Sequence, residues 1–180
     1  MSDGIKAIET EYDGHRFRSR LEARWAVFFN AIGLDYEYEI EGFEMDGIKY
    51  LPDFYIPSLN RWFEIKGQSL ALDEIKKCEE FCLRLDKESI KYSILIGSPS
   101  LCAVRLGDYF GILEYVWEWV SDKYPENVRF QSPQGLIKEE YYSRFLQGLW
   151  VVPDKTEEEV AIAAIAAGKA RFEFGEKPDV

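Results

Sequence analysis

Two carboxylates and a lysine lie close together in the stretch LPDFYIPSLNRWFEIKGQ. Glu64 and Lys66 are two residues apart in a run with strand-forming residues, so both side chains point to one face of the predicted strand. Asp53 belongs to the preceding strand, which a short turn joins to the next one. Its carboxylate can therefore meet that of Glu64 across the strand pair.

Two carboxylates at this separation repel each other, and without a cation one of them tends to be protonated. A divalent cation removes the conflict, and Asp, Glu and water form an oxygen ligand set suited to Mg²⁺ or Mn²⁺. Such a metal lowers the pKa of a bound water and neutralises phosphate charge. Lys66 can orient that water and stabilise transition-state charge. The residues therefore predict metal-dependent hydrolysis of a phosphodiester.

The composition leaves oxygen ligands as the basis for any metal chemistry. The chain has 180 residues, a net charge of −11 and 47% hydrophobic residues, enough for a folded core. It contains three cysteines and a single histidine, His15, which we expect to be an ordinary surface residue. The chain therefore has too few Cys and His residues for zinc fingers, and too few His residues for most Cys/His or Ser/His/Asp catalytic sites. No apolar stretch is long enough to span a membrane. The three cysteines form no paired framework, which suits a reducing cytoplasm, so we expect a cytoplasmic protein.

Positive charge is concentrated near the N-terminus. The segment HRFRSRLEAR has four arginines against one glutamate, whereas residues 35–50 are strongly acidic. Arg16, Arg18 and Arg20 are therefore candidates for contacts to DNA phosphates. The alternative is that they are solvated surface charges near the start of a helix.

Hydrophobic periodicity predicts the α/β class, with a mixed sheet flanked by helices. Ser19 and Glu22 have the spacing of a capping box, which predicts the start of a helix that runs to about Ile32. A purely structural role for Glu22, as a cap of this helix, is therefore one interpretation of this residue. The order is helix, three strands, helix, strand, at about residues 19–32, 35–40, 48–56 (interrupted by Pro52), 61–66, 72–85 and 91–97.

The remainder of the chain is rich in aromatic residues. It predicts a strand at about residues 115–120, a short helix over 141–150, and a helix that Thr156 caps and that runs to about Ala170. We expect an irregular lead-in over residues 1–14 and one domain over 15–153 with its core at 15–97. Beyond Pro153 we expect a C-terminal helix and tail, 154–180.

The pattern Pro52-Asp53 followed by Glu64-Ile65-Lys66, after a helix and within three strands, resembles the PD-(D/E)XK, or restriction-endonuclease-like, nuclease superfamily. The resemblance implies that Asp53, Glu64 and the carbonyl group of Ile65 bind Mg²⁺ or Mn²⁺, with Lys66 as a catalytic residue.

Two further site residues are implied by the resemblance. Many members carry a glutamate on the helix before the sheet, and Glu22 is the matching position for a catalytic and metal-binding residue. Gln68 lies where some members place a polar residue near the phosphate, and is a further catalytic candidate.

The implied function is a metal-dependent DNA endonuclease that is structure-selective or non-specific. The short gap between the motifs, together with Glu22, Asp53, Glu64 and Lys66 in one small chain, is similar to phage-type Holliday-junction resolvases. This resemblance implies a role in phage DNA recombination, with repair, defence and mobile-element movement as alternatives. A protein of this size that cuts both strands often works as a homodimer. The alternatives are a catalytically inactive nuclease-like module that binds DNA or protein, and an acidic inhibitor that mimics DNA.

Overall fold

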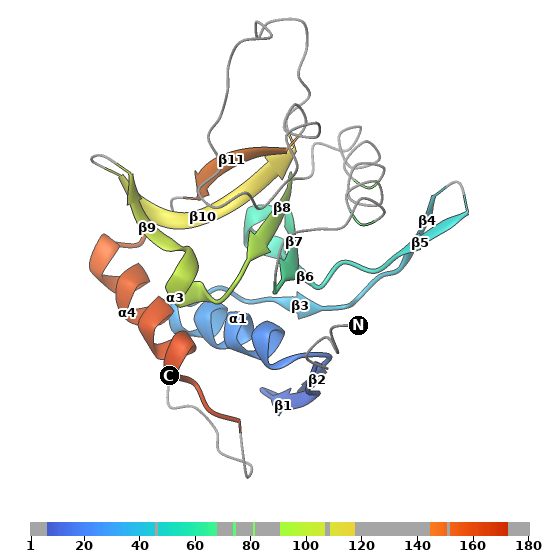
Figure 1. The fold of residues 1–180 in the computed structure, drawn as a ribbon, viewed down its shortest axis with the longest axis horizontal. Helices are drawn as coiled ribbons and strands as arrows, with labels where there is room; N and C mark the ends of the chain where they lie inside the picture. The colour runs from blue at the N-terminus through green and yellow to red at the C-terminus, as the bar shows by residue number, and fades with distance from the viewer. Residues whose placement is uncertain are drawn as a thin grey trace, which may run out of the picture.

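A mixed sheet forms the centre of the molecule (Figure 1). The computed structural model describes residues 7–45, 47–67, 74, 81, 91–106, 109–117, 145–150 and 152–172. The sheet order is β11-β10-β8-β7-β6-β3, and β9 also pairs with β10. The strands are β3 (Glu37–Tyr38), β6 (Phe54–Ile56), β7 (Arg61–Lys66), β8 (Lys91–Ile96), β9 (Ala103–Leu106), β10 (Tyr109–Trp117) and β11 (Phe145–Trp150). Because β7 and β8 are parallel and the other described pairs antiparallel, the expected mixed sheet is confirmed.

The pairing of β6 with β7 sets the positions of the predicted site residues. Phe54 lies opposite Phe63, so one further step of the register places Asp53 opposite Glu64. The connection is a 3-10 turn, η1 (Pro57–Leu59), followed by Asn60 at φ 46°. Asparagine is one of the few residues that adopt this left-handed conformation readily.

Three helices pack against one another beside the sheet: α1 (Arg20–Ala31), α3 (Pro99–Cys102) and α4 (Glu157–Lys169) (Figure 1). Helix α1 begins at the predicted cap, because the Ser19 side chain accepts the Glu22 backbone N–H at 3.2 Å. Its buried face, which includes Trp25, Phe28 and Phe29, joins Phe63 and Ile65 in the main core. The predicted alternation of β7 is confirmed, because Trp62 packs on Phe43 and Phe81 and Glu64 bonds Tyr50 and Lys66, away from this core.

Helix α4 is part of the same core rather than an appendage. Thr156 and Glu159 form the predicted capping box, and Val160, Ala163 and Ala167 are buried in the cluster that contains α1. Pro153 therefore marks a turn within one packed unit. Among the described residues, no helix has the length and apolarity needed to cross a membrane.

Two short hairpins lie outside the central sheet. Strands β1 (Thr10–Tyr12) and β2 (His15–Phe17) pair around Asp13 (φ 51°) and Gly14 (φ 76°), the conformation of a type I′ turn. The expectation of an irregular lead-in is therefore wrong for Thr10–Tyr12. The second hairpin, β4 (Phe43–Met45) with β5 (Ile48–Tyr50), projects away from the body of the molecule (Figure 1).

The strand predicted over residues 48–56 divides at Pro52. Strand β5 pairs with β4, whereas β6 pairs with β3 and β7. Proline cannot donate to a ladder, so the chain leaves one sheet and enters the other at this point. The strand expected over 35–40 is shorter than predicted, because β3 covers only Glu37–Tyr38.

The short helix predicted over residues 141–150 is wrong for its described part. Phe145–Trp150 forms β11, whose six residues pair antiparallel with β10 from Ile112 to Trp117. Gly148 weakens a helix at this place, and the long β10 offers a complete partner. Strand β10 starts earlier than predicted, and residues 118–120 lie outside the described residues, as does most of the helix predicted over 72–85.

Candidate active site

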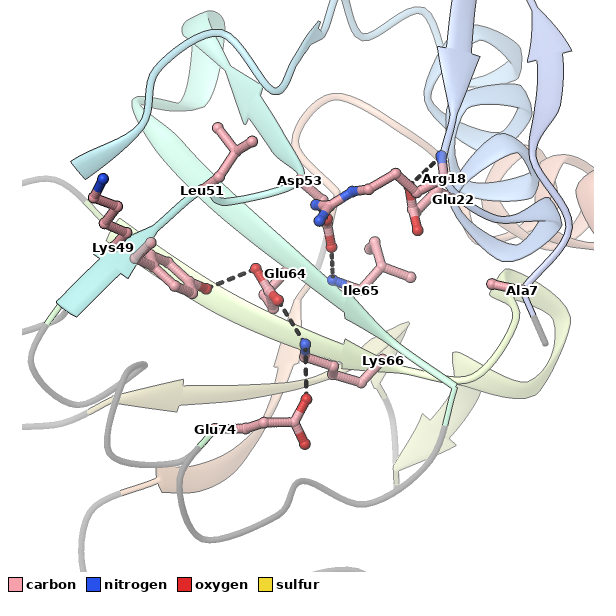
Figure 2. A pocket seen from close by; sticks show the side chains of 11 residues that line it. Ala7, Arg18, Glu22, Lys49, Leu51, Asp53, Glu64, Ile65, Lys66 and Glu74 are labelled. Atoms are coloured by element: carbon pink, nitrogen blue, oxygen red, sulfur yellow. Dashed lines mark hydrogen bonds and ion pairs between the residues drawn. The ribbon is translucent and has the colours of Figure 1, made fainter. Parts of the chain in front are cut away.

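A cavity of about 380 Å³ lies where α1, β5, β6 and β7 approach one another (Figure 2). Its polar lining consists of Arg18, Glu22, Lys49, Tyr50, Asp53, Glu64, Lys66 and Glu74. Ile65 also lines it, so the structure brings together the five positions for which the sequence predicted metal binding or the catalytic lysine. Gln68, the remaining catalytic candidate, lies outside the described residues.

Asp53 is buried, with 3% of its surface exposed, and both carboxylate oxygens have partners. Oδ2 accepts the backbone N–H of Ile65 at 2.7 Å, and Oδ1 accepts Nη2 of Arg18 at 2.9 Å. Burial, followed by the negative charges of Glu64 and Glu22, raises the pKa of Asp53 well above its usual value. The four carboxylates of the polar lining also outnumber its three cations, Arg18, Lys49 and Lys66.

Glu64 is held from both sides. Its Oε1 pairs with Nζ of Lys66 at 2.8 Å, and its Oε2 accepts the Tyr50 hydroxyl at 2.6 Å. Lys66 also pairs with Oε1 of Glu74 at 3.2 Å. Burial lowers the pKa of Lys66, but the two carboxylates outweigh it and raise that pKa overall.

Glu22 lines the cavity, and its carboxylate does not complete the capping box that the sequence suggested, because among the described contacts it does not bond the Ser19 backbone N–H. Its Oε1 accepts the Ser19 hydroxyl at 2.7 Å, while Oε2 accepts the Tyr38 hydroxyl at 2.5 Å and the Arg18 backbone N–H at 3.1 Å. Burial, and then the bond to Glu22, raises the pKa of Tyr38. The Ser19 side chain caps the helix, and the Glu22 carboxylate is held beside the cavity by bonds to Ser19, Tyr38 and Arg18.

Of the three candidate arginines, Arg18 lines the cavity. Its Nη2 bonds Asp53, and its Nε forms an ion pair with Oε1 of Glu39. Burial lowers the pKa of Arg18, but the hydrogen bond with Tyr38 and the charges of Asp53, Glu39 and Glu22 raise it overall. Arg16 is exposed and pairs with Glu9, and Arg20 begins helix α1 without lining the cavity.

Sequence reasoning did not identify several polar residues of the site. Tyr38, Tyr50 and Glu39 each contact a residue of the predicted site, and Lys49 and Glu74 line the cavity. Glu39 carries one local feature, a backbone φ of 47° that is uncommon for a residue other than glycine.

The carboxylate oxygens of the cavity are of the chemical type that a divalent cation prefers. Glu22, Asp53 and Glu64 offer hard oxygen ligands to one cavity, and their mutual repulsion is relieved by added positive charge. In the described part of the chain, however, no three Asp, Glu, His or Cys side chains already lie close enough to hold a metal ion. Instead, Arg18 forms an ion pair with Asp53, and Lys66 forms one with Glu64.

Comparisons with protein-family models, with curated proteins and with solved structures find no match to this chain. The chemistry of the cavity is the basis on which a function can be assigned.

Proposed function

We propose that this protein is a metal-dependent nuclease that hydrolyses phosphodiester bonds of DNA. The observation that carries the proposal is the meeting of Asp53, Glu64 and Lys66 in one cavity, with both carboxylates buried. Buried acidic groups with a surplus of negative charge destabilise a fold unless a cation binds them, which favours a functional role.

The arrangement of the elements supports a restriction-endonuclease-like fold within the PD-(D/E)XK superfamily. Helix α1 precedes the sheet and contributes Glu22, Asp53 immediately precedes β6, and β7 ends with Glu64 and Lys66. Strand β8, which comes after the predicted second helix in the sequence, pairs parallel with β7. The sequence motif and the strand register thus agree on the same residues.

In this proposal each site residue has a distinct role. Glu22, Asp53 and Glu64 would hold the metal ion, which supplies Lewis acidity and lowers the pKa of water. Lys66, an ammonium held by Glu64 and Glu74, donates hydrogen bonds to the attacking water and to the phosphoryl oxygens. Tyr38 and Tyr50 fix the orientation of Glu22 and Glu64.

A polynucleotide substrate is favoured by the cations around the cavity. Lys49 is exposed, and the Arg18 side chain is 55% exposed, so both can reach phosphates that flank the scissile bond. The body of the protein carries a net charge of −11, which limits affinity for DNA elsewhere on the surface. We therefore expect the DNA to bind mainly through Arg18 and Lys49 beside the cavity.

Plasmid cleavage tests the proposal. Supercoiled DNA is incubated with wild type in Mg²⁺, Mn²⁺ or EDTA, and with Asp53→Asn, Glu64→Gln and Lys66→Met. The two amide substitutions keep the size of each side chain. Each variant should lose at least about a hundredfold in rate. Glu37→Gln, an exposed carboxylate on β3, and Lys91→Met, an exposed lysine on β8, serve as matched controls.

The outcomes separate the alternatives. Cleavage that continues in EDTA would end the metal mechanism. DNA binding without cleavage in either metal would identify an inactive binding module, and neither binding nor cleavage would favour a DNA mimic. A flapped DNA and its linear counterpart, compared in the same assay, test the expected structural selectivity.

A further inference from the structure

We infer that Arg18 is an exchangeable cation of the active site. In the metal-free protein, Arg18 neutralises Asp53. When a metal ion binds Asp53, the Nη groups of Arg18 turn to a phosphate of the substrate, and the Nε of Arg18 stays paired with Glu39. The inference rests on the proposed nuclease function and assigns a substrate-binding role within that site.

The contacts of Asp53 show why Arg18 and a metal ion compete. Oδ2 of Asp53 is committed to the backbone N–H of Ile65 at 2.7 Å, which a strand–strand contact holds in place. Oδ1 is bonded by the side chain of Arg18, whose Nη2 lies 2.9 Å from it in the cavity. A divalent ion bound to Oδ1 would repel a guanidinium at this distance strongly, because the carboxylate is buried.

Other contacts of Arg18 hold this residue at the site after the exchange. Its backbone N–H is fixed by Glu22 Oε2 and by the Tyr38 hydroxyl, each at 3.1 Å. Its Nε pairs with Glu39, whose own backbone N–H bonds the carbonyl oxygen of Asp53 at 3.0 Å. Losing Asp53 as a partner therefore releases the outer end of the guanidinium and leaves the inner end anchored.

The chemistry of the released group matches a phosphate. A guanidinium presents paired N–H donors that fit two phosphate oxygens, whereas an ammonium is a point charge. Arg18 opens on the cavity that contains Lys66, so a phosphate held there lies beside the reacting group. Arg16, two residues earlier on β2, is exposed and paired with Glu9, which makes it the matched control.

Two binding measurements test the inference. Mn²⁺ affinity is measured by titration calorimetry, and affinity for a labelled DNA duplex is measured by fluorescence anisotropy in Ca²⁺, which we expect to bind with little cleavage. Arg18→Met should bind Mn²⁺ at least about tenfold more tightly, because a competing charge is removed. The same variant should bind DNA at least about tenfold more weakly. Arg16→Met should leave Mn²⁺ affinity unchanged.

Arg18→Lys keeps the charge and provides a second test if the methionine variant does not fold, as judged by circular dichroism. It should retain wild-type Mn²⁺ affinity within about threefold. It should still lose DNA affinity, because lysine lacks the paired N–H donors of a guanidinium. An Arg18→Met variant with unchanged or weaker Mn²⁺ binding, or with no more DNA loss than Arg16→Met, would overturn the inference and leave the nuclease proposal intact. A wild type that binds neither Mn²⁺ nor Mg²⁺ would overturn both.

Discussion

The hydroxyl of Tyr50 donates a 2.6 Å hydrogen bond to Oε2 of Glu64 and lies 2.5 Å from the hydroxyl of Tyr92. Because Tyr50 gives its proton to Glu64, Tyr92 is the donor in the second bond. The three side chains come from β5, β7 and β8, so a hairpin outside the central sheet fixes a carboxylate on that sheet. With Lys66 on the other oxygen, Glu64 has one preferred orientation.

Tyr50→Phe tests this positioning role. We expect about a tenfold loss in the rate of plasmid cleavage and in Mn²⁺ affinity, the lower end of the range for removing a group that orients a metal ligand. Tyr55→Phe is the control, because its hydroxyl bonds Asn60 Oδ1 in an exposed position. Wild-type rate and metal affinity in Tyr50→Phe would show that Lys66 alone orients Glu64.

The parts of the site that sequence could predict are those that local geometry dictates. Alternation along β7 placed Glu64 and Lys66 together, and the short link from Asp53 limited how far its carboxylate could lie from Glu64. The contact between Ser19 and Glu22 is likewise set within one helical turn. Residues close in sequence have few alternative arrangements.

The residues that sequence did not reveal reach the site through tertiary pairing. Tyr50 is 14 positions from Glu64 and Tyr38 is 16 positions from Glu22, so no periodic pattern links them. The same reason explains the incorrect helix at 145–150. A six-residue pairing with β10 outweighs a weak local preference that Gly148 further reduces.

Gly168 on α4 should not tolerate a side chain, although alanine is the better helix former. A Cβ at this position would lie 2.5 Å from Oγ and 2.8 Å from Cβ of Ser100 on α3. The Cβ of Ser100 cannot move without its backbone, so Gly168→Ala should cost about 1–3 kcal/mol of unfolding free energy. Chemical denaturation measures the change, and adding Ser100→Gly should restore most of it. A single variant at least as stable as wild type would contradict the close packing of α3 and α4.

The capping box of α4 predicts a specific pH dependence. Bonds from the backbone N–H and the hydroxyl of Thr156, both 2.8 Å from Oε2 of Glu159, lower the pKa of that carboxyl. A lowered pKa adds stability that is present above the unfolded-state pKa and is lost as pH falls through the folded-state value. The melting temperature of wild type should therefore exceed that of Glu159→Gln at neutral pH, and the difference should shrink in acid. Glu158→Gln removes the same charge from the first turn and leaves the bonds between Thr156 and Glu159 intact, so it is the matched control.

The cations that we expect to bind DNA phosphates are those that line the cavity. The sequence suggested Arg16, Arg18 and Arg20, but the structure places Arg18 and the unsuspected Lys49 on the cavity. Each phosphate contact contributes about 0.9 to the slope of log affinity against log salt concentration. The double variant Arg18→Met, Lys49→Met should therefore flatten the slope by up to about 1.8, since two contacts are lost.

The matched double variant Arg16→Met, Arg20→Met removes the same charge from positions that do not line the cavity. Its slope should change by less than half as much, because these side chains are not aimed at phosphates flanking the scissile bond. Anisotropy titrations in Ca²⁺ over a series of salt concentrations give both slopes with the same labelled duplex. Equal flattening in the two variants would mean that DNA is held by the whole basic segment, and a larger effect in the second would move the binding surface to the outer side of β2 and the start of α1.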